Sequence, residues 1–160
     1  MNETYLALVK VVMDQYKLDP ITSFHGVQHW GRVNDIGQAI VAKNGGNSDV
    51  VKYFALLHDC CREHDGKDPD HGRRAAAFAK ENRDLIELSD EEFETLIFAL
   101  ANHADGPTSD DPTIGSCFDG DRLDLGRVGI VPDKEQLSTD VAKEDEFFAW
   151  GQKLNEKDER

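Results

Sequence analysis

Apolar residues recur at helical spacing along most of this chain. Within residues 26–43 the stripe runs from His29 through Val33 and Ile36 to Ile40. Positions three or four residues apart share one face of a helix, so such a stripe predicts a helix with one buried side. The same reasoning predicts helices over residues 2–18, 48–61, 70–82, 89–103, 113–129 and 139–153.

Polar residues mark the ends of several predicted helices. Gly45-Gly46 closes the second helix, and Ser48 or Asp49 caps the third. Ser89, with Glu92 three residues later, forms a capping box. No run alternates apolar and polar residues as a half-buried strand does. The predicted fold class is therefore all-α, a bundle of about six or seven helices.

Length and apolar content predict one domain over residues 1–160. The chain has 160 residues, of which 39% are hydrophobic. Its apolar runs are far shorter than the roughly 20 residues that span a bilayer, so we expect no membrane partner. The acidic start lacks a signal-peptide pattern, and three cysteines in such a chain fit a reducing compartment. We therefore expect a cytoplasmic protein.

The formal net charge of −14 bears on the partners of this protein. A surface this acidic repels a polyphosphate backbone, so we expect no nucleic acid partner. A small anionic substrate is compatible with the charge, because a metal ion and one or two arginines can reverse the field within a pocket.

Histidine and aspartate residues gather in short clusters beside the predicted helices. In chain order the clusters are His25-Gly26-Val27-Gln28-His29, His58-Asp59, Asp70-His71-Gly72, Asn102-His103 and Asp119–Asp124. Imidazole nitrogen and carboxylate oxygen are ligands for borderline or hard divalent metals. Helices that pack together can bring such clusters to one ion. The pattern therefore predicts a metal site inside a helical bundle.

His58-Asp59 is the most informative cluster. Its neighbours form an apolar stripe, and burying a carboxylate there costs several kcal/mol unless a cation or hydrogen bonds compensate it. A metal would compensate Asp59, His58 and His29 together, whereas a structural network of ion pairs is the alternative. His25 and His64 fall in predicted loops and are the weakest candidates. We expect His64 to be solvated.

Residues 119–124 carry three acids in six residues, namely Asp119, Asp121 and Asp124. On a helix Asp121 and Asp124 share a face at i, i+3, while Arg122 points elsewhere. The apolar neighbours of these acids indicate a partly buried acidic site. Spacing alone does not say which aspartate is a ligand.

The order of His29, His58-Asp59 and Asp121 resembles the H…HD…D pattern of the HD-domain superfamily of metal-dependent phosphohydrolases. Residues 25–33 look like that family's first motif, residues 55–59 like its second and residues 121–124 like its last. The similarity covers about residues 24–129 and is closest to small HD proteins without a fused regulatory domain.

The resemblance implies a helical HD domain that binds a divalent metal ion (Mn, Fe, Ni, Co, Zn or Mg) through His29, His58, Asp59 and Asp121. It places Asp119 at a helix entry and gives Asp124 a supporting role, in which it orients an arginine or a ligating histidine.

A second metal is also implied. In binuclear HD proteins two further histidines lie between the HD pair and the final aspartate, and the HD aspartate bridges both ions. His71 and His103 occupy such positions here. Polar residues flank both, so neither is expected in the core. We therefore expect one or two ions per chain. The alternative for His71 is that it begins a helix or binds substrate phosphate.

The resemblance implies hydrolysis of a nucleotide or another small phosphate ester. Asp59, Arg62 and Arg122 are the predicted catalytic residues, with the arginines placed at the phosphoryl group, where they stabilise growing charge. Salt bridges to nearby acids are the alternative role for these arginines.

Departures from the family narrow the prediction. HD-GYP phosphodiesterases carry a Gly-Tyr-Pro motif, whereas this chain has His103-Ala104-Asp105-Gly106-Pro107, which argues against cyclic dinucleotide hydrolysis. The nucleotidase branch has an acid three residues after the HD aspartate, where this chain has Arg62, so the general acid or base is not assigned. HD-type di-iron oxygenases share the H…HD…H…H…D order, and a non-catalytic nucleotide-binding HD domain is the remaining alternative.

Overall fold

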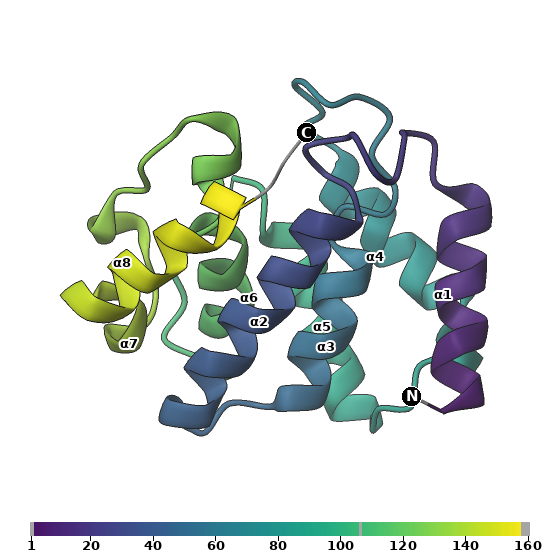
Figure 1. Cartoon of the computed structure of the whole chain (residues 1–160). Coiled ribbons are helices and arrows are strands. Elements are labelled where there is room, and N and C mark those ends of the chain that lie inside the picture. Colours follow the sequence, from purple (N-terminus) through teal and green to yellow (C-terminus); the bar gives the residue numbers. More distant parts are fainter. Residues whose placement is uncertain (1, 106, 158–160) are drawn as a thin grey trace.

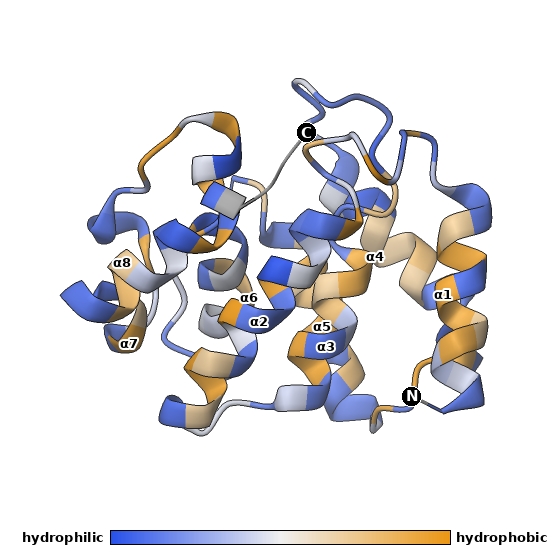
Figure 2. Ribbon diagram, in the orientation of Figure 1, coloured by the Kyte–Doolittle hydropathy of each residue, from blue (hydrophilic) through white to orange (hydrophobic). Residues whose placement is uncertain are grey.

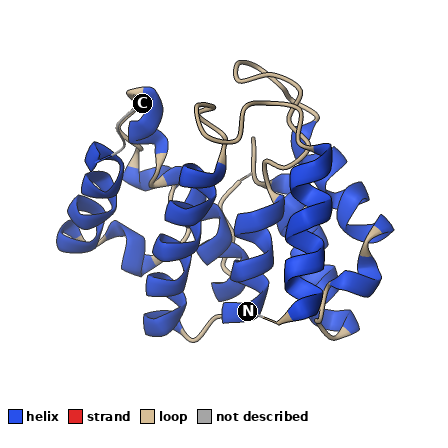
Figure 3. Ribbon diagram, turned by 45° about the vertical axis from the view of Figure 1, so that its right-hand side comes forward, coloured by secondary structure: helices blue, strands red, loops and turns tan. Residues whose placement is uncertain are grey.

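The computed structural model describes residues 2–105 and 107–157, and every regular element in them is helical (Figure 1, Figure 3). Within this part the α-helices are α1 (Glu3–Gln15), α2 (Val27–Asn44), α3 (Ser48–Leu57), α4 (His71–Glu81), α5 (Asp90–Asn102), α6 (Pro112–Arg122), α7 (Asp140–Lys143) and α8 (Asp145–Lys153). Short 3-10 helices cover Arg83–Leu85, Leu125–Val128, Lys134–Gln136 and Leu154–Lys157. The predicted all-α fold class is confirmed.

Polar side chains cap the helices largely as predicted. At the start of α5, the side chains of Ser89 and Glu92 each accept a hydrogen bond from the other residue's backbone N–H, which confirms the capping box. The cap of α3 differs, because Asn47 accepts the hydrogen bond from the backbone N–H of Val50. Asn47 has an extended backbone just before the helix, whereas Ser48 and Asp49 already belong to it.

The helix predicted over residues 48–61 ends early. α3 stops at Leu57, so His58 and Asp59 lie in the turn that follows. Adjacent side chains on a helix point about 100° apart. His58 keeps a right-handed helical backbone, and the chain then tightens, since the N–H of Cys60 donates to the carbonyl oxygen of Leu57 and that of Arg62 to the carbonyl oxygen of Asp59.

The helices predicted over residues 113–129 and 139–153 are both interrupted. α6 ends at Arg122, and the 3-10 helix after it closes at Gly129 with a φ of 78°, a left-handed conformation that glycine adopts without strain. The last helix breaks at Glu144, whose extended backbone separates α7 from α8. This break explains why the described residues contain more helices than predicted.

α2 lies at the centre of the bundle, packed against α3 and α6 (Figure 1). α3 also packs against α5, which in turn packs against α4. Phe54, Leu100 and Phe118 are among the fully buried side chains between these helices. Burial of each side chain contributes about 1.5–3 kcal/mol to the free energy of folding.

The α3–α4 loop at the top of the view is hydrophilic along most of its length (Figure 2). None of the described helices has both the length and the apolar character to cross a bilayer.

Helix ends that carry predicted site residues meet at one end of the bundle. His29 lies in the first turn of α2 and His71 is the first residue of α4, while His58 and His103 directly follow α3 and α5. Gly72 permits one of these approaches, because a Cβ at this position would lie 2.6 Å from a backbone oxygen of α5. α4 and α5 therefore meet closely enough to bring their histidines together.

Candidate metal centre

The residues predicted as metal ligands converge in two neighbouring groups. The first donor group consists of His29, His58 and Asp121, and the second donor group consists of Asp59, His71 and His103. Within each group, one ligand atom from every residue lies within 4.8 Å of the others. Segments far apart in the chain thus bring all six predicted ligands together.

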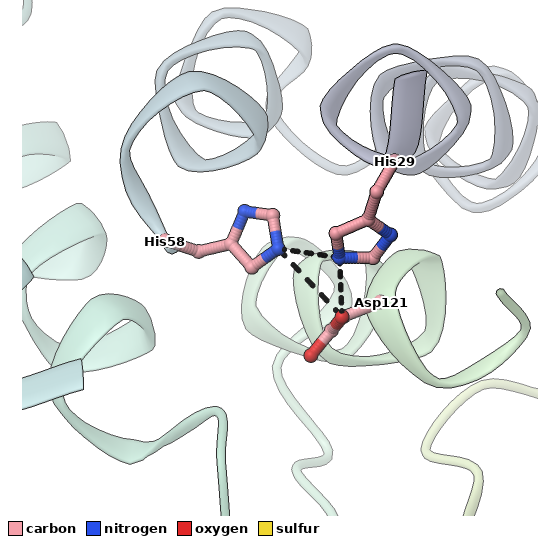
Figure 4. A group of neighbouring side chains, drawn as sticks. All are labelled: His29, His58 and Asp121. Atoms are coloured by element: carbon pink, nitrogen blue, oxygen red, sulfur yellow. Dashed lines mark hydrogen bonds and ion pairs between the residues drawn. The ribbon is translucent and has the colours of Figure 1, made fainter. Parts of the chain in front are cut away.

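The ligand atoms of the first donor group have the spacing of an ion's coordination shell (Figure 4). His29 Nε2 lies 3.0 Å from His58 Nε2 and 3.2 Å from Asp121 Oδ1. Asp59 Oδ2 lies 3.3 Å from His29 Nε2 and 3.4 Å from His58 Nε2. Ligands about 2.1 Å from one ion are about 3.0–3.5 Å apart in octahedral or tetrahedral geometry. Two nitrogens and two oxygens can therefore share one ion.

The other carboxylate oxygen of Asp59 belongs to the second donor group. His71 Nε2 lies 2.9 Å from His103 Nε2 and 3.2 Å from Asp59 Oδ1. Asp59 thus faces one group with each oxygen, as a carboxylate that bridges two ions does. His71 and His103 are only 4% and 2% exposed, so the expectation that they lie outside the core is wrong. Their flanking residues are polar, but the close contact of α4 and α5 covers their rings.

The second ring nitrogen of each histidine in these groups faces an oxygen acceptor. His29 Nδ1 lies 2.7 Å from Asp124 Oδ2. The Nδ1 atoms of His58, His71 and His103 lie 2.6–3.2 Å from backbone carbonyl oxygens. An oxygen acceptor keeps a hydrogen on Nδ1, so the four Nε2 atoms are the positions at which a metal ion, or a proton in its absence, is held. Lone pairs this close together repel each other unless a cation lies between them.

Charge around the two groups also favours a cation. Burial alone would lower the pKa of His58, but Asp59 and Asp121 outweigh burial and raise that pKa to about 10. Burial alone would raise the pKa of Asp59, but His58, His103 and His29 hold it well below its usual value. Without a metal, the buried imidazole of His58 therefore holds a proton beside the buried carboxylates. A divalent ion can replace that proton. The donor set fits a metal ion.

Asp124 and Asp119 differ in ways that their spacing did not reveal. Asp124 is fully buried and joins His29 to Arg32, whose Nε lies 2.8 Å from Asp124 Oδ1. These contacts are the ones expected of a residue that orients a histidine and an arginine, and the role of Asp124 in metal binding stays a prediction. Asp119 does not lie at a helix entry, because it is buried within α6 and accepts hydrogen bonds from the backbone N–H and the hydroxyl of Thr139. It anchors the segment before α7 and belongs to neither donor group.

A cavity of about 370 Å³ opens beside the two donor groups. Its walls include four of the predicted ligands and four cationic side chains: Asp59, His71, His103, Asp121, Arg62, Lys67, Arg122 and Arg127. This volume suits a small molecule. The cations make the cavity suitable for an anion despite the acidic surface of the protein.

The two arginines predicted to bind phosphate both line this cavity. Arg62 Nε lies 3.2 Å from Asp59 Oδ1, so Arg62 also makes the salt bridge considered as its alternative role. Arg122 donates a hydrogen bond to the carbonyl oxygen of Gln136 and lies over the ring of Phe118. Contact of either arginine with phosphate stays a prediction.

Two further residues line the cavity: Arg127, which the sequence did not predict for the site, and His25, which it predicted only as a weak candidate. Arg127 Nη2 lies 4.0 Å from Asp121 Oδ1, and the 3-10 helix after α6 brings it there. His25 is buried and lines the same cavity, whereas His64 is exposed as expected. The sequence signal for His25 was its place four residues before His29. Arg127 had no such signal.

Comparisons of the chain with protein-family models, curated proteins and solved structures found no match. The resemblance to HD-domain proteins therefore depends on the motifs alone. The geometry of the two donor groups is what indicates a candidate metal centre.

Proposed function

We propose that this chain is a metal-dependent phosphohydrolase that acts on a nucleotide or another small phosphate ester. One observation carries the proposal. Four imidazole Nε2 atoms and two carboxylates converge in two groups joined by Asp59, beside a cavity with cationic walls. The order of these ligands resembles that of HD-domain phosphohydrolases.

The chain's own residues would divide the work of hydrolysis. Divalent ions, one held by each donor group, would polarise a phosphoryl oxygen and lower the pKa of a water molecule bound to them. Arg62, Arg122 and Arg127 line the cavity, where they would bind anionic phosphoryl oxygens and stabilise charge that grows during the reaction. Asp59 would hold the two groups at a fixed separation through its two oxygens.

The proposal is tested with protein purified without chelators and loaded separately with Mn, Fe, Ni, Co, Zn or Mg. Release of inorganic phosphate is measured over a panel of nucleotides, sugar phosphates and simple phosphate esters. The unmodified protein and the His64→Ala control, altered at an exposed histidine, should both release phosphate, whereas Asp59→Asn should not. Equal turnover by Asp59→Asn would contradict the proposal.

The joined histidine pairs also favour a second candidate, a di-iron oxygenase, since two sites sharing one carboxylate suit iron as well. Oxygen consumption by the Fe(II)-loaded protein, without phosphate release, would support this alternative. Ligand binding without either reaction would support a non-catalytic nucleotide-binding domain.

A further inference from the structure

Among the described residues that line the cavity, His25 is the histidine outside both donor groups. It is only 6% exposed. Its ring lies edge to face with that of His29, with the ring centroids 6.3 Å apart. His25 therefore lies beside the metal centre without belonging to either group of ligands.

Hydrogen bonds fix both the backbone and the ring of His25. Its carbonyl oxygen accepts hydrogen bonds from the Tyr16 hydroxyl at 2.7 Å and the Trp30 indole N–H at 2.8 Å. Its ring Nδ1 lies 3.1 Å from Asp65 Oδ1, and the Ser23 hydroxyl donates to the same oxygen. The position of His25 is therefore set by four residues, one from α2 and three from the segments that follow α1 and α3.

Asp65 decides which ring nitrogen of His25 carries the hydrogen. Burial alone would raise the pKa of Asp65, but its hydrogen bonds from Ser23 and His25 lower it, so the carboxylate accepts and Nδ1 donates. In the neutral ring the single hydrogen therefore lies on Nδ1. Nε2 then carries a lone pair and has no hydrogen-bond partner within residues 2–105 and 107–157. Since Nδ1 is engaged, Nε2 is the nitrogen left to contact a molecule in the cavity.

We propose that His25 contacts the substrate, and that its Nε2 accepts a hydrogen bond from a hydroxyl or amino group of the molecule bound at the metal centre. Asp65 and Ser23 are positioning residues that keep Nδ1 as the donor. The inference rests on the proposed function and names a substrate class for it, the phosphate ester of a sugar, polyol or amino alcohol.

The remaining cavity walls fit this class. Asp105 and Gln136 add oxygen acceptors for hydroxyl or amino groups, alongside the arginines that suit the phosphate. None of the described residues lining the cavity is Phe, Tyr or Trp, so no such ring is available to stack a nucleobase. Hydrogen-bond acceptors rather than aromatic faces would therefore recognise the alcohol part of the ester.

The test uses matched phosphate esters with the manganese-loaded protein. Glycerol 1-phosphate is paired with propyl phosphate, and ethanolamine phosphate with ethyl phosphate. A buried acceptor discriminates strongly against an analogue that lacks the donor, so kcat/KM should favour the hydroxylated or aminated member by at least about tenfold. The His64→Asn control should keep this preference.

Two substitutions of His25 separate its ring nitrogens. His25→Asn keeps a polar group near the Nδ1 position but none at Nε2, so the preference should fall to near unity. His25→Gln places an amide near the Nε2 position and should retain part of the preference. A merely structural role would lower turnover of both esters in a pair equally, and a preference unchanged in His25→Asn would overturn the inference.

Calorimetric binding of the same esters supplies a readout independent of turnover. Asp65→Ala should weaken binding of the hydroxylated ester more than that of its partner, with metal content unchanged. If no ester is hydrolysed but this binding preference holds, the proposed function fails and the inference about His25 stands. If the esters are hydrolysed without preference for the hydroxylated or aminated member, the proposed function stands and the inference about His25 fails. Loss of metal from His25→Asn would overturn the inference, because His25 would then support the metal centre.

Discussion

The first and second donor groups differ in charge and in support. The first contains a second carboxylate, Asp121, and its His29 is backed by the buried carboxylate of Asp124. In the second, Nδ1 of both histidines faces only backbone carbonyl oxygens, and the carboxylate is the shared Asp59. A carboxylate behind a ligating imidazole raises its basicity. The first group should therefore bind its ion more tightly and fill first.

The two groups also occupy different parts of the bundle. The first joins α2, the turn after α3, and α6, which pack around the centre of the fold. The second joins the facing ends of α4 and α5 through the same turn after α3. Substitution of His71 or His103 in the second group should therefore leave metal binding by the first group intact, whereas substitution of Asp59 should weaken metal binding by both groups.

Asp59→Asn should have the largest effect, because Asp59 is the residue shared by the two groups. We expect metal content to fall from about two ions per chain to near none, and turnover to fall by roughly a thousandfold, equivalent to about 4 kcal/mol of barrier. Elemental analysis and phosphate release measure these losses. Circular dichroism should show the helices retained, and full metal content in this variant would refute the bridging role.

Joint replacement of His71 and His103 by alanine should remove one ion and spare the other. The expected metal content is about one ion per chain, held by the first group. The matched double variant of His29 and His58 should lose more metal, because it removes the tighter site. One ion per chain in the unmodified protein, unchanged in the first double variant, would reject the second site.

Asp121→Asn and Asp119→Asn should separate metal binding from folding. Asp121 belongs to the first donor group, so its variant should lose at least about a hundredfold in metal affinity, or about 2.7 kcal/mol. Asp119 holds Thr139 instead, so its variant should lose about 1–3 kcal/mol of stability with metal affinity unchanged. Calorimetric titration measures the metal affinity, and thermal unfolding measures the stability. A larger loss of metal affinity in Asp119→Asn than in Asp121→Asn would mean that Asp119, two residues earlier, is the ligand.

Asp124→Asn should weaken the first group without removing it. The asparagine can still accept a hydrogen bond from His29 but lacks the negative charge, so metal affinity should fall about 10–100-fold. Affinity of the second group should stay the same, because its histidines are backed by the main chain. Stepwise metal titration resolves the two affinities, and equal losses at both sites would contradict the comparison.

Metal binding to the first group should release protons. The pKa of His58 is raised to about 10 without metal, so near pH 7 an ion must displace the proton held there. Affinity should therefore fall about tenfold for each unit of decreasing pH and for each proton displaced. Burial lowers the pKa of His103, so the second group should depend less on pH. Titration in buffers of different ionisation enthalpy measures the released protons.

The sequence by itself determined the helical class and the approximate positions of the helices in this protein. Apolar periodicity and the capping box at Ser89 and Glu92 involve residues that are close in the sequence. They can therefore be predicted without the tertiary structure. The ligand types were also local, since a carboxylate next to an imidazole among apolar residues already called for a compensating charge at His58 and Asp59.

Tertiary structure alone decided which of the candidate residues meet. Asp119 and Asp121 are two residues apart in one helix, yet one holds Thr139 and the other faces His29, because packing of α6 against α2 gives its faces different neighbours. A Cβ at Gly120 would lie 3.0 Å from the backbone oxygen of Val33, so this packing is close. Arg127 reaches the cavity from a 3-10 helix and His25 from a loop, and the paths of both segments depend on contacts with distant parts of the chain. Such contacts leave no periodic pattern in the sequence.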